Sequence, residues 1–175
     1  MKILRIAVPV VIVVALPIIV WWCWFRCGPP TTLLLVRHAD RAGSQDALNA
    51  AGTARAQELV HVGGKAGITA IYRSDTNRAG DTAAPLASAL GLTPVVYPAN
   101  DTTPLVNTIL ADDPGERVFV VGHSNTVPQI IQAAGGSAIA NIDDAEFDNL
   151  FLLTVCRCRR GPATLINLQY GAVSP

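Results

Sequence analysis

Two short runs of the chain are apolar at every position, and they constrain the fold more than any other feature. The runs are LLLV at 33–36 and VFVV at 118–121, and neither alternates apolar with polar residues. A strand needs such a run when both of its faces are covered, as in a parallel sheet with helices on either side. Polar residues follow each run at once, in RHADR and in GHSNT. The sequence therefore predicts a buried parallel sheet with chemically active groups at its strand ends.

The rest of the chain alternates between strand and helix patterns. Further strands are predicted at 68–72, 94–97, 150–156 and 164–168, beside those at 32–37 and 118–121. Helices are predicted at 53–62, 78–90, 104–110 (with Thr103 as N-cap) and 126–134. The last two strands are separated by CRCRRGP, which suits a hairpin turn. This order predicts an α/β fold, a three-layer α/β/α sandwich with a mostly parallel sheet and an antiparallel end.

Residues 6–25, IAVPVVIVVALPIIVWWCWF, carry no charge. A helix of this length reaches roughly 30 Å, the hydrocarbon thickness of a bilayer. The run is longer than the core of about 7 to 15 residues in a signal peptide, and no small-residue cleavage site precedes WWCWF. Two basic residues lie before the run and one follows it. We therefore expect a single-pass transmembrane anchor, with a cytoplasmic N-terminus and an exported (periplasmic or extracytoplasmic) domain.

This interpretation divides the chain into a short tail (1–5), the anchor (6–25), a linker (26–31) and one domain (32–175). The chain has 13 basic and 13 acidic residues, and three of the basic ones lie within residues 1–26. The domain is therefore mildly acidic, which excludes a basic nucleic-acid binder. The four cysteines lack zinc-site spacing, and Cys156 and Cys158 share one face of a strand, so we predict no disulfide, no metal and no cofactor.

Arginine and histidine gather after three of the predicted strands, in RHADR at 37–41, RSDTNR at 73–78 and GHSNT at 122–126. In open α/β sheets the carboxyl ends of the strands form the site. Arginine forks match phosphate oxygens, and a neutral imidazole beside them can attack phosphorus. A second imidazole can donate to a phosphate oxygen. The third histidine, His61, falls within a predicted helix and is expected on the surface.

Four blocks, LLLVRHAD, LNAAGTARAQEL, YRSDTNRAGDTA and VVGHSNT, resemble in order the motifs of the histidine phosphatase superfamily, which has the phosphoglycerate-mutase-like fold. The resemblance spans about residues 32–170 and is closest to the small branch with phosphohistidine-phosphatase-like proteins. It implies that His38 is the nucleophile and that Arg37, Arg78 and His123 complete the phosphate pocket. Arg41 is a further candidate for phosphate binding, as is Ser44, which stands where many members have asparagine.

The proton donor for the leaving group has two candidates. Family members often carry an acid in the segment after the third strand, where this chain has Asp101, and Asp40 directly follows the nucleophile motif. If neither acts, alkyl phosphates should react slowly, while phosphoramidates and aryl phosphates stay accessible.

These features predict a membrane-anchored phosphatase that acts on a small phosphorylated molecule or a phosphoprotein through a phosphohistidine. The alternative is a pseudo-phosphatase that binds a phosphorylated ligand without turnover. A serine hydrolase with Ser124 as nucleophile is excluded because no histidine follows His123 to complete its triad.

Overall fold

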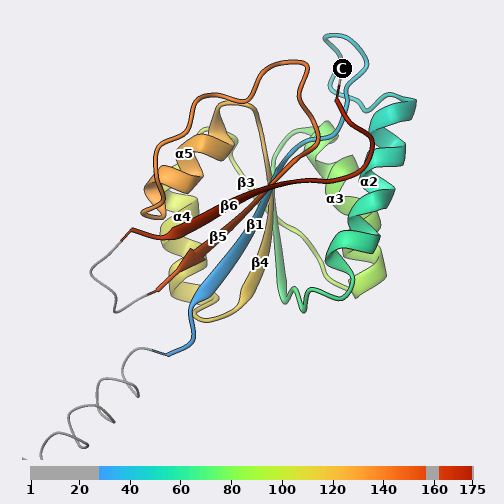
Figure 1. The fold of residues 1–175 in the computed structure, drawn as a ribbon. Helices are drawn as coiled ribbons and strands as arrows, with labels where there is room; N and C mark the ends of the chain where they lie inside the picture. The colour runs from blue at the N-terminus through green and yellow to red at the C-terminus, as the bar shows by residue number, and fades with distance from the viewer. Residues whose placement is uncertain (1–27, 157–161, 175) are drawn as a thin grey trace, which may run out of the picture.

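A computed structural model describes residues 28–156 and 162–174, which form a six-stranded sheet between two pairs of helices (Figure 1). The strands are β1 (Thr31–Arg37), β2 (Ala70–Ser74), β3 (Val95–Tyr97), β4 (Arg117–Gly122), β5 (Asn149–Val155) and β6 (Thr164–Gln169). The helices are α2 (Ala50–Gly63), α3 (Asn77–Leu90), α4 (Thr102–Asp112) and α5 (Thr126–Ala133). Every strand and helix predicted for the domain is present, with bounds shifted by three residues or fewer.

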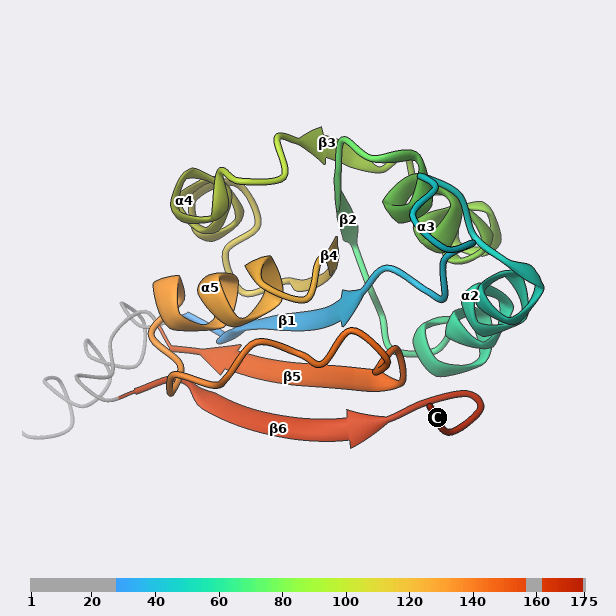
Figure 2. The same ribbon diagram turned by 90° about the horizontal axis from the view of Figure 1, so that it is seen from above.

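The strands lie in the order β3-β2-β4-β1-β5-β6. β1 pairs parallel with β4, and β2 pairs parallel with both β4 and β3. β5 runs antiparallel to β1 and to β6. Seen from above, α4 and α5 cover one face of the sheet, while α2 and α3 cover the other (Figure 2). The predicted α/β sandwich, with a mostly parallel sheet and an antiparallel end, is confirmed.

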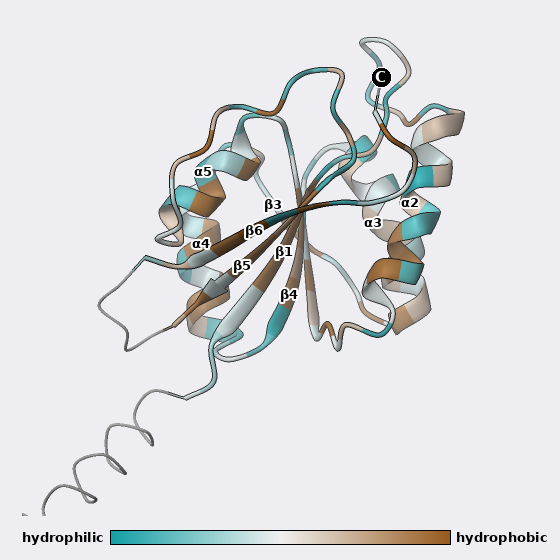
Figure 3. Ribbon diagram, viewed as in Figure 1, coloured by the Kyte–Doolittle hydropathy of each residue, from teal (hydrophilic) through white to brown (hydrophobic). Residues whose placement is uncertain are grey.

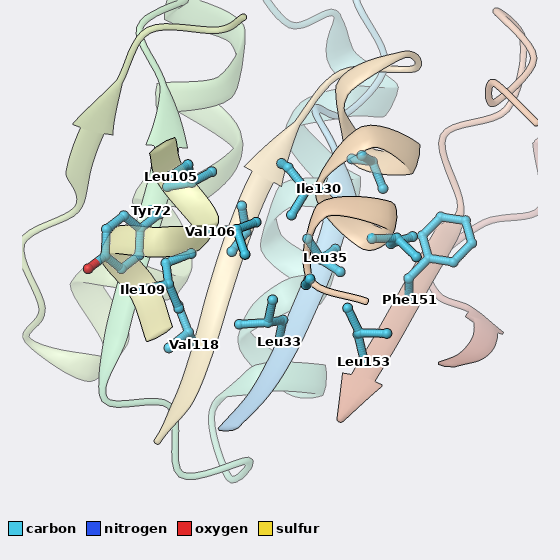
Figure 4. Packing of buried hydrophobic residues seen from close by; sticks show 14 of the residues in the cluster. Leu33, Leu35, Tyr72, Leu105, Val106, Ile109, Val118, Ile130, Phe151 and Leu153 are labelled. Atoms are coloured by element: carbon cyan, nitrogen blue, oxygen red, sulfur yellow. The ribbon is translucent and has the colours of Figure 1, made fainter. Parts of the chain in front are cut away.

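The packing of β1 explains why its sequence does not alternate. Leu33 and Leu35 pack into the core under α4 and α5 (Figure 4), whereas Leu34 and Val36 pack into the core under α2 and α3. The VFVV run of β4 divides between the two cores in the same way. Both faces of these two strands are therefore dry, and apolar residues are favoured at each position.

The antiparallel end of the sheet is less covered. Ile166 and Leu168 of β6 each keep 47% of their surface exposed. In the hydropathy colouring, β6 lies in front of the other strands and no helix crosses over it in this view (Figure 3). The two cores thus enclose the parallel strands, whose carboxyl ends carry the arginine and histidine clusters.

Two predictions differ from the structure or lie beyond it. Helix α4 begins at Thr102 with Asp101 as its N-cap residue, two positions before the predicted cap, so that Pro104 lies within the first turn. The predicted anchor at 6–25 lies outside the described residues. Within residues 28–156 and 162–174, no helix is long and apolar enough to cross a membrane. Cys156 is exposed and free. Cys23, Cys27 and Cys158 lie outside the described residues.

Candidate active site

The register of β1 against β4 brings two histidines together. Arg37 at the end of β1 pairs with Gly122 at the end of β4, so the next residue of each chain segment is a histidine. The His38 N–H donates to the Gly122 carbonyl at 2.9 Å. The ring centroids of His38 and His123 lie 5.3 Å apart. Two residues far apart in the sequence therefore face the same space.

The His38 ring is fixed in a form suited to nucleophilic attack. Its Nδ1 lies 2.9 Å from the carbonyl oxygen of Ala39, an acceptor, so Nδ1 must carry the ring proton. Nε2 is then left with a free lone pair. Burial, together with the nearby positive charge of Arg37, lowers the pKa of His38 from 6.5 to about 3. The imidazole is therefore neutral at physiological pH.

The loop that carries His38 is held by polar contacts from two helices. The Ala39 N–H donates to the Thr82 hydroxyl of α3 at 2.9 Å, and this hydroxyl donates to the carbonyl of Arg78 at 2.7 Å. Asp40 accepts from Arg55 of α2, with Nε–Oδ2 at 2.6 Å. Gly52 is required nearby because a Cβ there would clash with the carbonyl oxygen of Asp40. The glycine of the LNAAGTARAQEL block thus lets α2 approach the nucleophile loop.

His123 lies between a hydroxyl and a guanidinium. Its Nε2 is 2.8 Å from the Ser74 hydroxyl, and its Nδ1 is 3.4 Å from Arg78. A hydroxyl both donates and accepts, so Ser74 supports either ring tautomer. In this structure Nδ1 accepts from Arg78, whose guanidinium carries only donors; when an oxyanion takes that Arg78 N–H, the ring proton can move to Nδ1 and donate to the oxyanion. Burial, and next the charge of Arg78, lowers the pKa of His123 to about 4, so this ring is also neutral.

Arg37 is the most constrained cation of the site. It is 2% exposed, and its Nη1 donates to the carbonyl oxygens of Asp143 and Glu146 at 2.6 and 2.9 Å. Its guanidinium lies over the Phe147 ring at 4.2 Å. Asp144 of the same loop approaches Nη2 at 3.4 Å. The loop between α5 and β5 therefore wraps the guanidinium and holds it in place.

These residues line a pocket of about 250 Å³ at the carboxyl ends of β1, β2 and β4. Its lining comprises Arg37, His38, Arg41, Thr76, Arg78, Ala99, Asn100, His123, Ser124, Asn125, Thr126 and Asp144. The buried Nε atoms of Arg37 and Arg78 have no hydrogen-bond partner within the described part of the chain. Buried donors without an acceptor are costly and uncommon in folded proteins. Both guanidiniums keep a spare donor and both residues line one pocket, which indicates a place for an anion.

Five of the predicted site residues line this pocket: Arg37, His38, Arg41, Arg78 and His123. Ser44 does not, because residues 42–47 close a turn of their own (Ala42 N to Ala47 O, 3.1 Å) and Ser44 is exposed on it. Asp101 does not either, because it is the exposed N-cap residue of α4, and Ala99 and Asn100 form that wall instead. The Asp40 carboxylate is engaged by Arg55.

Four further residues bear on the site without having been singled out from the sequence: Ser74, Thr82, Asp144 and Phe147. Ser74 and Thr82 are the serine and threonine of the YRSDTNRAGDTA block, so a signal for them was present. Asp144 and Phe147 belong to a loop without periodic pattern, and no sequence signal indicated that it would fold over Arg37. The described residues contain no group of three or more His, Cys, Asp or Glu placed to hold a metal ion.

Comparison with known proteins relates part of the chain to one family. A model of the histidine phosphatase superfamily (branch 1) matches residues 33–100. No curated protein sequence matches the chain significantly. Among solved structures, the protein histidine phosphatase SixA complexed with tungstate superposes with a TM-score of 0.59 at 19% identity, over 79% of this chain and 96% of SixA.

Two other solved structures superpose in a similar way. A mycobacterial glucosyl-3-phosphoglycerate phosphatase gives a TM-score of 0.57 at 17% identity, covering 82% of this chain and 99% of its own. The phosphoglycerate mutase of Plasmodium falciparum gives 0.51 at 18% identity, covering 85% and 94%. At these identities the structural likeness concerns the fold. The family match and the four ordered motifs go further, and together they define a phosphatase. The chain is thus similar to the histidine phosphatase superfamily, in the fold of its described residues and in the motifs within residues 33–100.

Proposed function

We propose that the chain hydrolyses a phosphomonoester or a phosphoramidate through a phosphohistidine on His38. The observation that carries this proposal is that the guanidiniums of Arg37 and Arg78 line one pocket beside a neutral imidazole. The guanidinium donors match the oxygens of a phosphoryl group, and the imidazole presents a lone pair to its phosphorus. The tungstate of the SixA complex is a tetrahedral oxyanion, and so is consistent with a pocket of this kind.

The reaction takes place in two displacements. The His38 Nε2 lone pair forms a bond to phosphorus as the bond to the leaving group breaks, and the leaving group takes that electron pair. Water then attacks the phosphohistidine, the P–N bond breaks, and phosphate leaves as the ring regains its lone pair. Arg37, Arg78 and the Nδ1–H of His123 stabilise the charge on the oxygens in both steps.

The lining of the pocket favours substrates whose leaving group needs no proton from the protein. Asp101 and Asp40 do not line it, and the one carboxylate that does, Asp144, sits beside the positive charge of Arg37. The described lining of the pocket therefore offers the leaving group no acid other than the one in contact with a guanidinium. An alkyl alcohol would therefore leave slowly, whereas a protonated nitrogen or an aryl oxide leaves without that help. We propose phosphoramidates or aryl phosphates as the substrate class, carried on a small molecule or on a protein.

The full-length chain with p-nitrophenyl phosphate and phosphoramidate as probes tests the proposal. His38→Ala should lower kcat by more than about a thousandfold, while His61→Ala, an exposed histidine on α2, should change it by less than about twofold. Acid-quenched samples with radiolabelled substrate should contain an alkali-stable, acid-labile phosphoprotein that His38→Ala abolishes. Phosphate binding without turnover or phosphoprotein would refute the proposal and establish the pseudo-phosphatase.

We further propose that residues 6–25 anchor the enzyme in a membrane, with the domain exported; the apolar run and its flanking charges support this. His38 follows β1 directly, so a strand of about 20 Å separates the pocket from the point where the chain enters the sheet. An anchored enzyme would then present its pocket away from the bilayer. A topology reporter fused after Pro175 should be active only outside the cytoplasm. A cytoplasmic reporter would overturn the exported location.

A further inference from the structure

Asp144 is the one carboxylate that lines the pocket among the described residues, and it contacts Arg37. The position of Arg37 does not depend on this contact. Asp144 is 82% exposed, and it contacts Arg37 Nη2 at 3.4 Å, which is long for a charged hydrogen bond. Arg37 is held meanwhile by the carbonyl oxygens of Asp143 and Glu146 and by the face of Phe147. The carboxylate can therefore leave at small cost, and the guanidinium stays where it is.

A bound phosphoryl group would displace this carboxylate. Both anions seek the same Nη2 edge of Arg37, and two anions close together repel one another. The phosphoryl group would also contact Arg78, which lines the same pocket and with which Asp144 forms no ion pair in the structure. The phosphoryl group is therefore favoured on Arg37. Asp144 is then left on the pocket lining without its cationic partner.

We infer that Asp144 selects substrates in which the phosphoryl group is bonded to a protonated nitrogen. This inference rests on the proposed function and assigns a specificity-determining residue to it. The positive nitrogen supplies the partner that Asp144 loses, and the carboxylate in turn favours the protonated form of the nitrogen. In that form the P–N bond breaks with its electron pair passing to nitrogen, and the amine leaves with its protons already in place. An aryl phosphate has no positive nitrogen to pair with Asp144, and its phosphoryl group places a second anion beside the carboxylate.

The uncharged part of the pocket lining agrees with this assignment. The pocket lining also includes Ala99, Asn100, Ser124 and Asn125, none of which is charged. Asp46, another carboxylate near the site, is bound to Arg78 and to the backbone N–H groups of Asn77 and Arg78 outside the pocket lining. Asp144 is thus the one anionic side chain lining the pocket among the described residues.

The experiment compares phosphoramidate with p-nitrophenyl phosphate in the full-length chain. Asp144→Asn should lower kcat/KM for phosphoramidate by about tenfold, the size of one charge-assisted contact. It should leave kcat/KM for p-nitrophenyl phosphate unchanged or raise it by about threefold, because repulsion is removed. Asp143→Asn removes the same charge one residue away on a side chain that does not line the pocket, and it should shift the ratio of the two values by less than about twofold.

Half-molar salt should also reduce the preference of the wild-type chain for phosphoramidate over p-nitrophenyl phosphate, because the Asp144 carboxylate is exposed and its charge is screened. Equal losses on both substrates in Asp144→Asn would overturn the inference and leave Asp144 as a residue that merely orders Arg37. An unchanged ratio would overturn it as well. The phosphohistidine on His38 tests the proposed function separately from the role of Asp144. This intermediate should still form in Asp144→Asn, whether or not the ratio of the two kcat/KM values changes.

Discussion

The floor and the rim of the pocket are built differently. The floor consists of side chains that are 0 to 8% exposed and held by several partners: Arg37, His38, Ser74 and His123. The rim consists of residues that line the opening with few contacts of their own: Arg41, Asn100, Ser124, Asn125 and Asp144. The floor residues lie at the ends of strands whose register is set by the two hydrophobic cores, whereas the rim residues lie in loops. We therefore expect the floor to determine the chemistry and the rim to determine which substrate enters.

The largest expected difference concerns two residues of the turn between β4 and α5. His123→Ala removes a donor aimed at the phosphoryl oxygens, and should lower kcat by about a hundredfold or more. Asn125→Ala, on the rim of the same turn, should lower it by less than about threefold. Steady-state kinetics with p-nitrophenyl phosphate measures both. Equal losses would remove the distinction between floor and rim.

The same contrast should appear in stability. Arg55→Met leaves the Asp40 carboxylate, 13% exposed, without its partner behind the floor, and should lower the free energy of unfolding by about 3 kcal/mol. Asp46→Asn breaks the pair with Arg78, in which the carboxylate side chain is 41% exposed, and should cost less than about 1 kcal/mol. Urea denaturation of each variant gives the comparison. A larger loss for Asp46→Asn would contradict it.

Much of this floor followed from the sequence, because it depends on features that a sequence carries directly. Unbroken apolar runs revealed β1 and β4, and a histidine after each run had to lie at the same sheet edge. The role of Ser74 required the distance across β2 and β4, which no pattern supplies. The rim was predicted poorly for a physical reason: Ser44 and Asp101 were assigned by position in a motif, but loop residues follow their own turns and caps. Asp144 acquires its place only when its loop folds over Arg37.

Acidification should act on the floor through its two neutral imidazoles. His38 and His123 have folded-state pKa values of about 3 and about 4, below the 6.5 of an unfolded chain. Between these values the unfolded state binds more protons, so stability falls as pH decreases from 7 to 5, by about 2 kcal/mol for each imidazole. Urea unfolding at both pH values measures this loss. In His38→Gln/His123→Gln the loss should be much smaller, and an unchanged loss would show that other groups cause it.

The smallest effects are expected at the two predicted site residues that lie off the pocket. Ser44→Ala and Asp101→Asn should each change kcat/KM for p-nitrophenyl phosphate by less than about twofold, since neither side chain lines the cavity. Ethyl phosphate makes the test sharper, because its alcohol needs a proton to leave. A loss in Asp101→Asn confined to ethyl phosphate would mean that the segment after β3 brings Asp101 inward during turnover. The rim would then take part in the chemistry, and the division between floor and rim would hold only for substrates that leave without a proton donor.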